Sequence, residues 1–271
     1  MLTNITLGQY FPGDSFIHNL DPRTKILSTL IYIVAIFLAS SPVTYGILIA
    51  FAALVIAISR LPWLLVLKSL KPIWIIVLLT LCIHMFTAPG DDVVFTWKFL
   101  SVTREGIEMG IKMALRLVLL LLFSSVLTFT TSPIILTDGI EHLLRPFKAL
   151  GVPAHELAMM MTIALRFIPT LLEETDRIMK AQTARGADFA SGTVFNRLKN
   201  MLPILVPLFV SAFRRADELA IAMEARCYRG GEGRTRMHEL AYRARDYSSF
   251  VIMLALCLLL SLLRWGDICV L

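Results

Sequence analysis

The sequence is poor in charged residues and in cysteines. Charged residues make up 17% of its 271 positions, against about 25% in typical globular proteins. Its four cysteines show no Cys-x-x-Cys spacing, so neither a disulfide framework nor a metal site is predicted. The Gly-x-x-x-x-Gly-Lys-Ser/Thr, His-Glu-x-x-His and Gly-x-Ser-x-Gly motifs are also missing. These absences argue against a chain that itself hydrolyses ATP and against a membrane-embedded hydrolase.

Apolar residues are abundant instead. They make up 57% of the chain, and the mean hydropathy is +0.73. Several apolar runs approach the roughly 20 residues that cross a bilayer core, so we predict an all-α integral membrane protein. The first 24 residues contain no apolar core, and we therefore expect no cleavable signal peptide. The net charge of +6 is typical of basic residues on the cytoplasmic side of such a protein, and no nucleic-acid partner is predicted.

Five stretches are predicted to span the membrane, with the N-terminus inside and the C-terminus outside. An uncharged turn at 40–42 joins the first two, and an acidic turn at 89–92 is typical of a non-cytoplasmic loop. A short interfacial helix is expected at 61–70, where basic residues return the chain to the cytoplasmic side. The predicted spans are residues 26–39, 43–59, 72–87, 106–130 and 250–263.

Residues 131–247 differ from the rest of the chain, because many charged residues lie there between apolar residues at helical spacing. We predict a lead-in with four transmembrane helices (1–130), a cytoplasmic coupling-helix domain (131–247) and a C-terminal transmembrane helix (248–271). Start and stop signals within the middle domain predict helices at 133–146, 154–185 and 196–226.

Two apolar pieces inside this domain, 157–172 and 201–213, could be mistaken for further spans. The first contains Arg166 and Pro169. If both pieces crossed as a hairpin, the lysines and arginines between them would lie outside the cell, against the usual charge bias. We therefore interpret both as amphipathic helices on or just under the cytoplasmic surface.

The two long helices of this domain are predicted to end at the same Ala-Arg step. Gly186 suits a helix C-cap, and a well-capped helix with a solvated arginine would explain one such end. The step recurs about forty residues later, which favours a function. An arginine fork pairs bidentately with a carboxylate, so each end is suited to an acidic groove on a soluble partner. The predicted docking residues are Ala184, Arg185, Gly186, Ala225, Arg226 and Cys227.

Several separate motifs resemble the transmembrane T component (EcfT) of energy-coupling factor transporters. Besides the Ala-Arg steps, they are PGDSFIHNLDPRTK (12–25), TSPI (131–134), LRFIPTLLEE (165–174) and MEARCYRGGEGRT (223–235), and they cover nearly the whole chain. One residue departs from the pattern.

Cys227 stands where that family usually has glycine. If the position requires a left-handed backbone, Cys227 is strained there. Alternatively, the helix continues to Arg229 and stops at Gly230 and Gly231.

The resemblance implies the coupling subunit of an ATP-driven importer of vitamins or other micronutrients. In that family two ABC-type ATPases lie below the membrane, a substrate-binding S component lies in it, and the T component links them. Each Ala-Arg end would then dock on one ATPase. The chain itself would be non-enzymatic and bind no cofactor, because ATP and Mg²⁺ would be used by the ATPases. It would be a multi-pass protein of the bacterial plasma membrane, with its N-terminus and coupling domain in the cytoplasm.

Two other groups of residues have alternative interpretations. Lys112 and Arg116 lie one turn apart in or near the fourth span, where they serve either as structural groups or as the path of a self-contained permease. The simplest interpretation of Met159, Met160 and Met161 is that they pack in the core. Their soft apolar side chains are also suited to an exchangeable contact with the S component.

Overall fold

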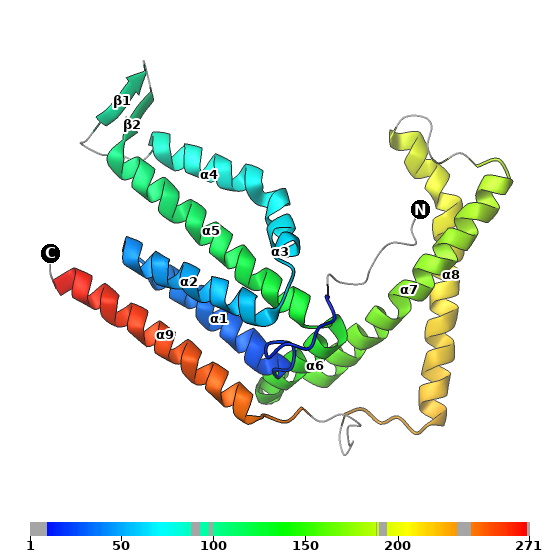
Figure 1. The fold of residues 1–271 in the computed structure, drawn as a ribbon. Coiled ribbons are helices and arrows are strands. Elements are labelled where there is room, and N and C mark those ends of the chain that lie inside the picture. The colour runs from blue at the N-terminus through cyan, green and yellow to red at the C-terminus, as the bar shows by residue number, and fades with distance from the viewer. Residues whose placement is uncertain are drawn as a thin grey trace. The chain divides into compact units, whose positions relative to one another are not determined.

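The computed structural model describes residues 10–87, 93–97, 100–187, 189, 194–231 and 240–269, and this part of the chain is almost entirely helical (Figure 1). Its elements in chain order are α1 (Pro22–Leu38), α2 (Pro42–Ser59), α3 (Trp63–Leu70), the 3-10 helix η1 (Lys71–Ile73), α4 (Trp74–Thr87), β1 (Val93–Trp97), β2 (Leu100–Thr103), α5 (Arg104–Thr130), α6 (Pro133–Leu144), the 3-10 helix η2 (Arg145–Leu150), α7 (Ala154–Ala184), α8 (Val194–Ala225) and α9 (Ala244–Cys269).

The chain divides into two compact units. We call residues 8–139 and 240–271 the bundle, and residues 140–239 the α7–α8 unit. The division falls inside α6, between Gly139 and Ile140. The α7–α8 unit begins nine residues after the start of the predicted coupling-helix domain (131–247) and ends eight residues before its end.

The predicted helical membrane fold is confirmed, and five helical stretches in the described residues are long and apolar enough to cross a membrane. They differ from the predicted spans at two places. The third stretch also includes the helix predicted at 61–70, and the first predicted span is not among the five. α1, the first predicted span, has 17 residues and would reach about 25 Å. α7 qualifies in its place, although it is the least apolar of the five. Its predicted location at the cytoplasmic surface stays a prediction. The five stretches are Pro42–Ser59, Trp63–Thr87, Arg104–Thr130, Ala154–Ala184 and Ala244–Trp265.

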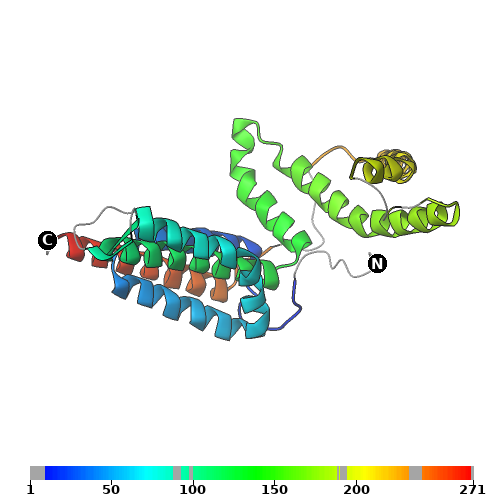
Figure 2. The ribbon, with the colours of Figure 1, turned by 90° about the horizontal axis from the view of Figure 1, so that it is seen from above.

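α5 is the central helix of the bundle. It packs against α1, α2, α3 and α4, while α9 packs along α1. These helices lie side by side in both views (Figure 1 and Figure 2). A helix is present where the interfacial helix was predicted, as α3, and its location at the membrane surface stays a prediction. It continues through η1 into α4 as one stretch, with a bend that Figure 1 shows clearly. Pro72 lies in η1, where its missing N–H and its ring favour a change of helix direction.

Aromatic stacking forms the middle of the bundle core. The rings of Tyr32 and Phe123 stack with their centroids 4.0 Å apart. The Tyr32 hydroxyl donates to the carbonyl of Leu48 at 2.9 Å, which satisfies the one polar group of this fully buried side chain. The other fully buried apolar side chains of this core are Ala35, Ile36, Leu48, Leu119 and Leu260.

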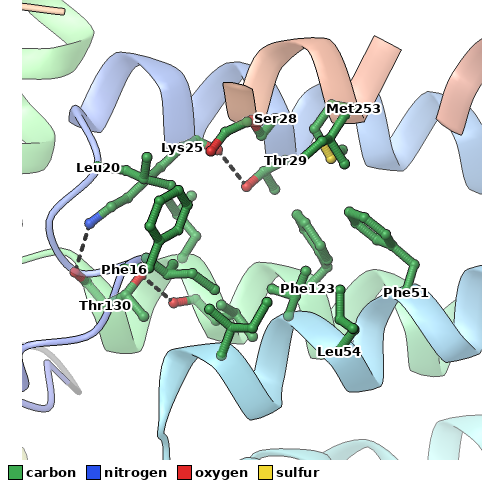
Figure 3. Close-up of a pocket in the computed structure, with 17 residues that line it drawn as sticks. Phe16, Leu20, Lys25, Ser28, Thr29, Phe51, Leu54, Phe123, Thr130 and Met253 are labelled. Atoms are coloured by element: carbon green, nitrogen blue, oxygen red, sulfur yellow. Dashed lines mark hydrogen bonds between the residues drawn. The ribbon is translucent and has the colours of Figure 1, made fainter. Parts of the chain in front are cut away.

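A buried lysine holds the first turn of α1 against the end of α5. Lys25 Nζ donates to the carbonyls of His18 (3.0 Å) and Thr130 (2.9 Å) and to Thr131 Oγ1 (3.3 Å). Burial lowers the pKa of Lys25 to about 8, although the carboxylates of Asp21 and Asp246 oppose that change. Figure 3 shows the contact with Thr130 beside an apolar pocket of about 130 Å³. This pocket is lined by the lead-in before α1 and by α1, α2, α5 and α9, through residues that include Phe16, Leu20, Phe51, Phe123 and Met253.

The last helix of the bundle is tied to the first by one carboxylate. Asp246, in the first turn of α9, accepts from the backbone N–H of Asp21 and from that of Arg243, both at 2.8 Å. Asp21 in turn caps α1, since its side chain accepts from the N–H of Arg23 at 2.9 Å. Arg23 donates to the carbonyl of Leu240 at 3.0 Å. Residues 225 positions apart in sequence thus fix the start of both helices.

A short antiparallel hairpin, β1 and β2, connects α4 to α5 and was not expected from the sequence. Its strands pair Trp97 with Leu100 and Thr96 with Ser101. The acidic turn predicted at 89–92 lies outside the described residues.

Two long helices, α7 and α8, form most of the α7–α8 unit. They pack against each other and cross rather than run in parallel (Figure 1). Both begin and end within two residues of the predicted limits. Each contains proline, Pro169 in α7 and Pro203 and Pro207 in α8, and each remains one continuous helix.

Candidate docking site at two helix ends

The end of α7 is closed by a Schellman motif. Arg185 is the C-cap residue, and Gly186 follows it in the left-handed conformation with φ +90°. The N–H of Gly186 binds the carbonyl of Thr183, and the N–H of Ala187 binds the carbonyl of Gln182, both at 3.0 Å. These are the 5→2 and 6→1 bonds that define this motif. The predicted helix end at Arg185 is therefore confirmed.

The end of α8 is built in the same way. Arg226 follows the last helical residue, Ala225, and Cys227 takes the left-handed position with φ +55°. The N–H of Cys227 binds the carbonyl of Glu224 at 2.8 Å, and the N–H of Tyr228 binds that of Met223 at 3.0 Å. The alternative in which the helix continues to Arg229 is wrong. The capping bonds hold Cys227 in a conformation that favours glycine.

Both arginines are exposed and available to a partner. Ala184, Arg185 and Gly186 are all exposed at the surface. So are the three equivalent residues of the second end, Ala225, Arg226 and Cys227. Among the described residues, neither guanidinium forms an ion pair. A guanidinium next to small residues at a helix end can approach a carboxylate closely and bind it through two parallel N–H bonds.

An ion pair joins the two helices that carry these ends. Arg215 on α8 lies 3.6 Å from Glu174 on α7. The sequence alone does not pair these charges, because their contact depends on where the two helices cross. A second pair, between Lys180 and Asp176, lies within α7 at i and i+4 and stabilises only that helix.

The three methionines do not share one surface. Met160 and Met161 are exposed, with 57% and 45% of their surface accessible. Met159 is less exposed, and its sulfur accepts a hydrogen bond from the Tyr228 hydroxyl at 2.9 Å. Consecutive residues point about 100° apart on a helix, so a run of three cannot lie on a single face.

α8 presents a larger apolar face that sequence reasoning did not assign to binding. Its members recur at helical spacing from Met201 to Phe213, before, between and after the two prolines, and each is more than 40% exposed. The sequence shows that these apolar residues lie close together along the chain. Only the structure shows that no other described element covers them. They are Met201, Leu202, Leu205, Val206, Phe209, Val210 and Phe213.

Lys112 and Arg116 both have partners within the bundle. Lys112 pairs with Glu108 at 2.7 Å. Arg116 lies over the ring of Phe37, 5.0 Å from its centroid, and approaches the Tyr45 hydroxyl at 3.4 Å. Both line an open cavity of about 450 Å³ at one end of the bundle, together with Glu105 and Arg264 among others. These contacts match structural roles for both residues.

Comparisons with known proteins show the family of the chain. The family model CbiQ, described as "Cobalt transport protein", matches residues 13–238. The chain is 70% identical to the energy-coupling factor transporter transmembrane protein EcfT of Acidaminococcus fermentans, over 98% of this chain and 99% of the relative. It is 57% identical to that of Clostridium kluyveri, over 98% and 100%, and 49% identical to that of Bacillus subtilis, over 97% and 100%. The chain therefore belongs to the EcfT family, the transmembrane components of energy-coupling factor transporters.

Proposed function

We propose that this chain couples two cytoplasmic ABC-type ATPases to a membrane-embedded substrate-binding S component, in an importer for vitamins or other micronutrients. The observation that carries the proposal is the equivalence of two helix ends. Each presents an exposed arginine at the C-cap of a Schellman motif. Two like ends suit two related subunits, or the two halves of a dimer.

Each arginine would enter an acidic groove on one ATPase. The capping bonds already satisfy carbonyls of the last turn, so the helix end does not need to rearrange when it docks. The guanidinium then supplies the specific contact. Movement of the ATPases on binding ATP would displace the two helix ends, and the α7–α8 unit would pass that displacement to the S component.

The exposed apolar face of α8 supports a contact with the S component. A continuous apolar face on a helix binds an apolar partner helix or lipid, because exposing it to water is unfavourable. Met160 and Met161 add a second soft, adaptable surface on α7. Such surfaces suit an exchange of one S component for another better than a fixed set of hydrogen bonds would.

The proposal assigns ATP and Mg²⁺ to the partner ATPases and no catalysis to this chain. It also places the N-terminus and the α7–α8 unit in the cytoplasm, because the two arginines must meet soluble subunits. The support is the charge bias of the sequence and the lack of a phosphate-binding motif in it.

The deciding experiment is co-purification from detergent with the candidate ATPase pair. Arg185→Glu and Arg226→Glu should each remove most of the recovered ATPase, because reversing a charge in an acidic groove costs about 2–5 kcal/mol. The matched controls are Arg177→Glu on α7 and Arg214→Glu on α8, both exposed arginines on the same helices. They should leave the recovery unchanged.

Equal recovery with the reversed and the wild-type arginines would show that the helix ends are not the docking points. An orientation test is independent of this one. A membrane-impermeant thiol reagent added to intact cells should fail to label Cys227, which is exposed in the structure. Labelling from outside would refute the cytoplasmic placement.

A further inference from the structure

The residue that follows Cys227 contacts the start of α7 through its side chain. Tyr228 completes the Schellman motif through its backbone N–H. Its hydroxyl donates to the Met159 sulfur at 2.9 Å and lies 3.4 Å from Nε2 of His155. One residue thus closes the end of α8 with its backbone and reaches α7 with its side chain.

His155 extends this contact to α6. It lies in the first turn of α7, and its Nδ1 donates to Oε1 of Glu141 on α6 at 3.1 Å. Both ring nitrogens therefore have partners, which fixes the rotation of the ring. The Glu141 side chain is only 13% exposed, so water weakens this hydrogen bond less than it would at an open surface.

Gly231 packs directly on the same ring. A Cβ built at Gly231 would lie 2.5 Å from Cδ2 and 2.6 Å from Cγ of His155, closer than any stable contact. The ring cannot move aside without losing Glu141 or Tyr228. Glycine is therefore required here for space, and the backbone after Arg226 lies against α7.

We propose that Tyr228, His155 and Glu141 are positioning residues that attach the Arg226 helix end to α6. α6 is the helix in which the chain passes from the bundle into the α7–α8 unit. The Arg185 end has no equivalent: in the described residues, no side-chain hydrogen bond joins 185–187 to another element. The two ends are thus unequal, and a displacement of Arg226 is transmitted directly to α6. The role in coupling rests on the proposed function, whereas the attachment itself does not.

The attachment can be tested on the free protein by spin-label distances. Labels at an Arg229→Cys site, outside the predicted docking residues, and at an Arg145→Cys site just after α6 measure the distance between the end of α8 and α6. The four native cysteines are changed to serine in this protein. We expect a narrow distance distribution in the otherwise wild-type chain. Tyr228→Phe keeps the ring and removes only the hydroxyl, and it should broaden the distribution by raising the population of the detached state about fivefold, as expected for one hydrogen bond.

The controls separate attachment from folding. Tyr242→Phe removes a tyrosine hydroxyl elsewhere and should leave the distribution narrow. Gly231→Ala should broaden it, because the added methyl displaces the His155 ring. A distribution that stays equally narrow in Tyr228→Phe and in Gly231→Ala would overturn the inference.

The coupling role is tested in the complex with the ATPases. With ATP added, the 145–229 distance should stay fixed in the otherwise wild-type protein and should change in Tyr228→Phe, with equal recovery of the ATPases. A distance that responds to ATP in the wild type would overturn transmission through α6. ATPase recovery that is unchanged by Arg226→Glu would instead refute the proposed docking. The result on the free protein would still stand.

Discussion

Gly186 and Cys227 occupy the same position in two matching Schellman motifs, and both are left-handed, with φ +90° and +55°. Each follows directly after an exposed arginine. The chain therefore builds the same helix end twice, once with the residue that this backbone favours and once without it. The position of the arginine is set by the capping bonds and not by the identity of the next side chain.

Replacing Cys227 should change stability in a direction set by the backbone. Cys227→Gly should stabilise the protein by about 1 kcal/mol, because glycine has no Cβ to clash in the left-handed region. Cys227→Val should destabilise it, since a β-branched side chain fits that region poorly. The measurement is the melting temperature of the detergent-solubilised protein. A lower melting temperature for Cys227→Gly would contradict the assigned conformation.

If the two arginines dock as proposed, replacing each by lysine should weaken ATPase binding without abolishing it. Arg185→Lys and Arg226→Lys keep the charge but lose the planar fork that binds a carboxylate bidentately. Loss of one charge-assisted hydrogen bond corresponds to roughly a tenfold weaker complex. Titration of the ATPase pair against the immobilised protein measures this. Affinity equal to wild type in both variants would mean that charge alone is recognised.

The α7–α8 contact should respond to a charge swap. Arg215→Glu and Glu174→Arg should each destabilise the protein slightly, and the double variant should recover most of the loss. Both side chains are about one-third exposed, so the coupling energy should be about 0.5 kcal/mol. A double-mutant cycle on unfolding free energies gives that number. Strict additivity of the two changes would show that the pair contributes nothing.

Lys25 should make stability depend on pH in an alkaline window. Its pKa is lowered from 10.5 to about 8 in the folded protein. Between these values the unfolded chain holds a proton that the folded protein has lost, so the free energy of unfolding rises with pH there, by at most about 3 kcal/mol. The difference between wild type and Lys25→Met at pH 8 and pH 10.5 isolates this effect. A difference that stays constant, or falls, would show that Lys25 is not buried as described.

Replacing the two basic residues of α5, Lys112 and Arg116, by glutamine should leave recovery of the ATPases unchanged. Lys112→Gln and Arg116→Gln remove the ion pair to Glu108 and the contacts to Phe37 and Tyr45. Both changes should lower stability modestly, while the ATPases are recovered as with wild type. Uptake by this chain reconstituted without ATPases, lost on either substitution, would instead support a self-contained permease.

The sequence was sufficient for the helices and for where the two long ones stop. Apolar runs and turn residues located the bundle helices, and the Ala-Arg steps marked the ends of α7 and α8 to within a residue or two. These features depend on local spacing and capping, which neighbouring residues determine. The hairpin β1–β2 was not predicted, because its strands are short and the sequence before them is typical of a loop.

Contacts between distant residues had to come from the tertiary structure. The sequence determined that this is a helical membrane protein with two arginine-bearing helix ends. Only the fold decided that Cys227 is left-handed, that Met159 turns toward Tyr228, and that His155 joins α7 to Glu141. The reason is physical: capping bonds and side-chain contacts between helices depend on how each helix is rotated and where it crosses its neighbour. Neither quantity can be obtained from the spacing of residues along one chain segment.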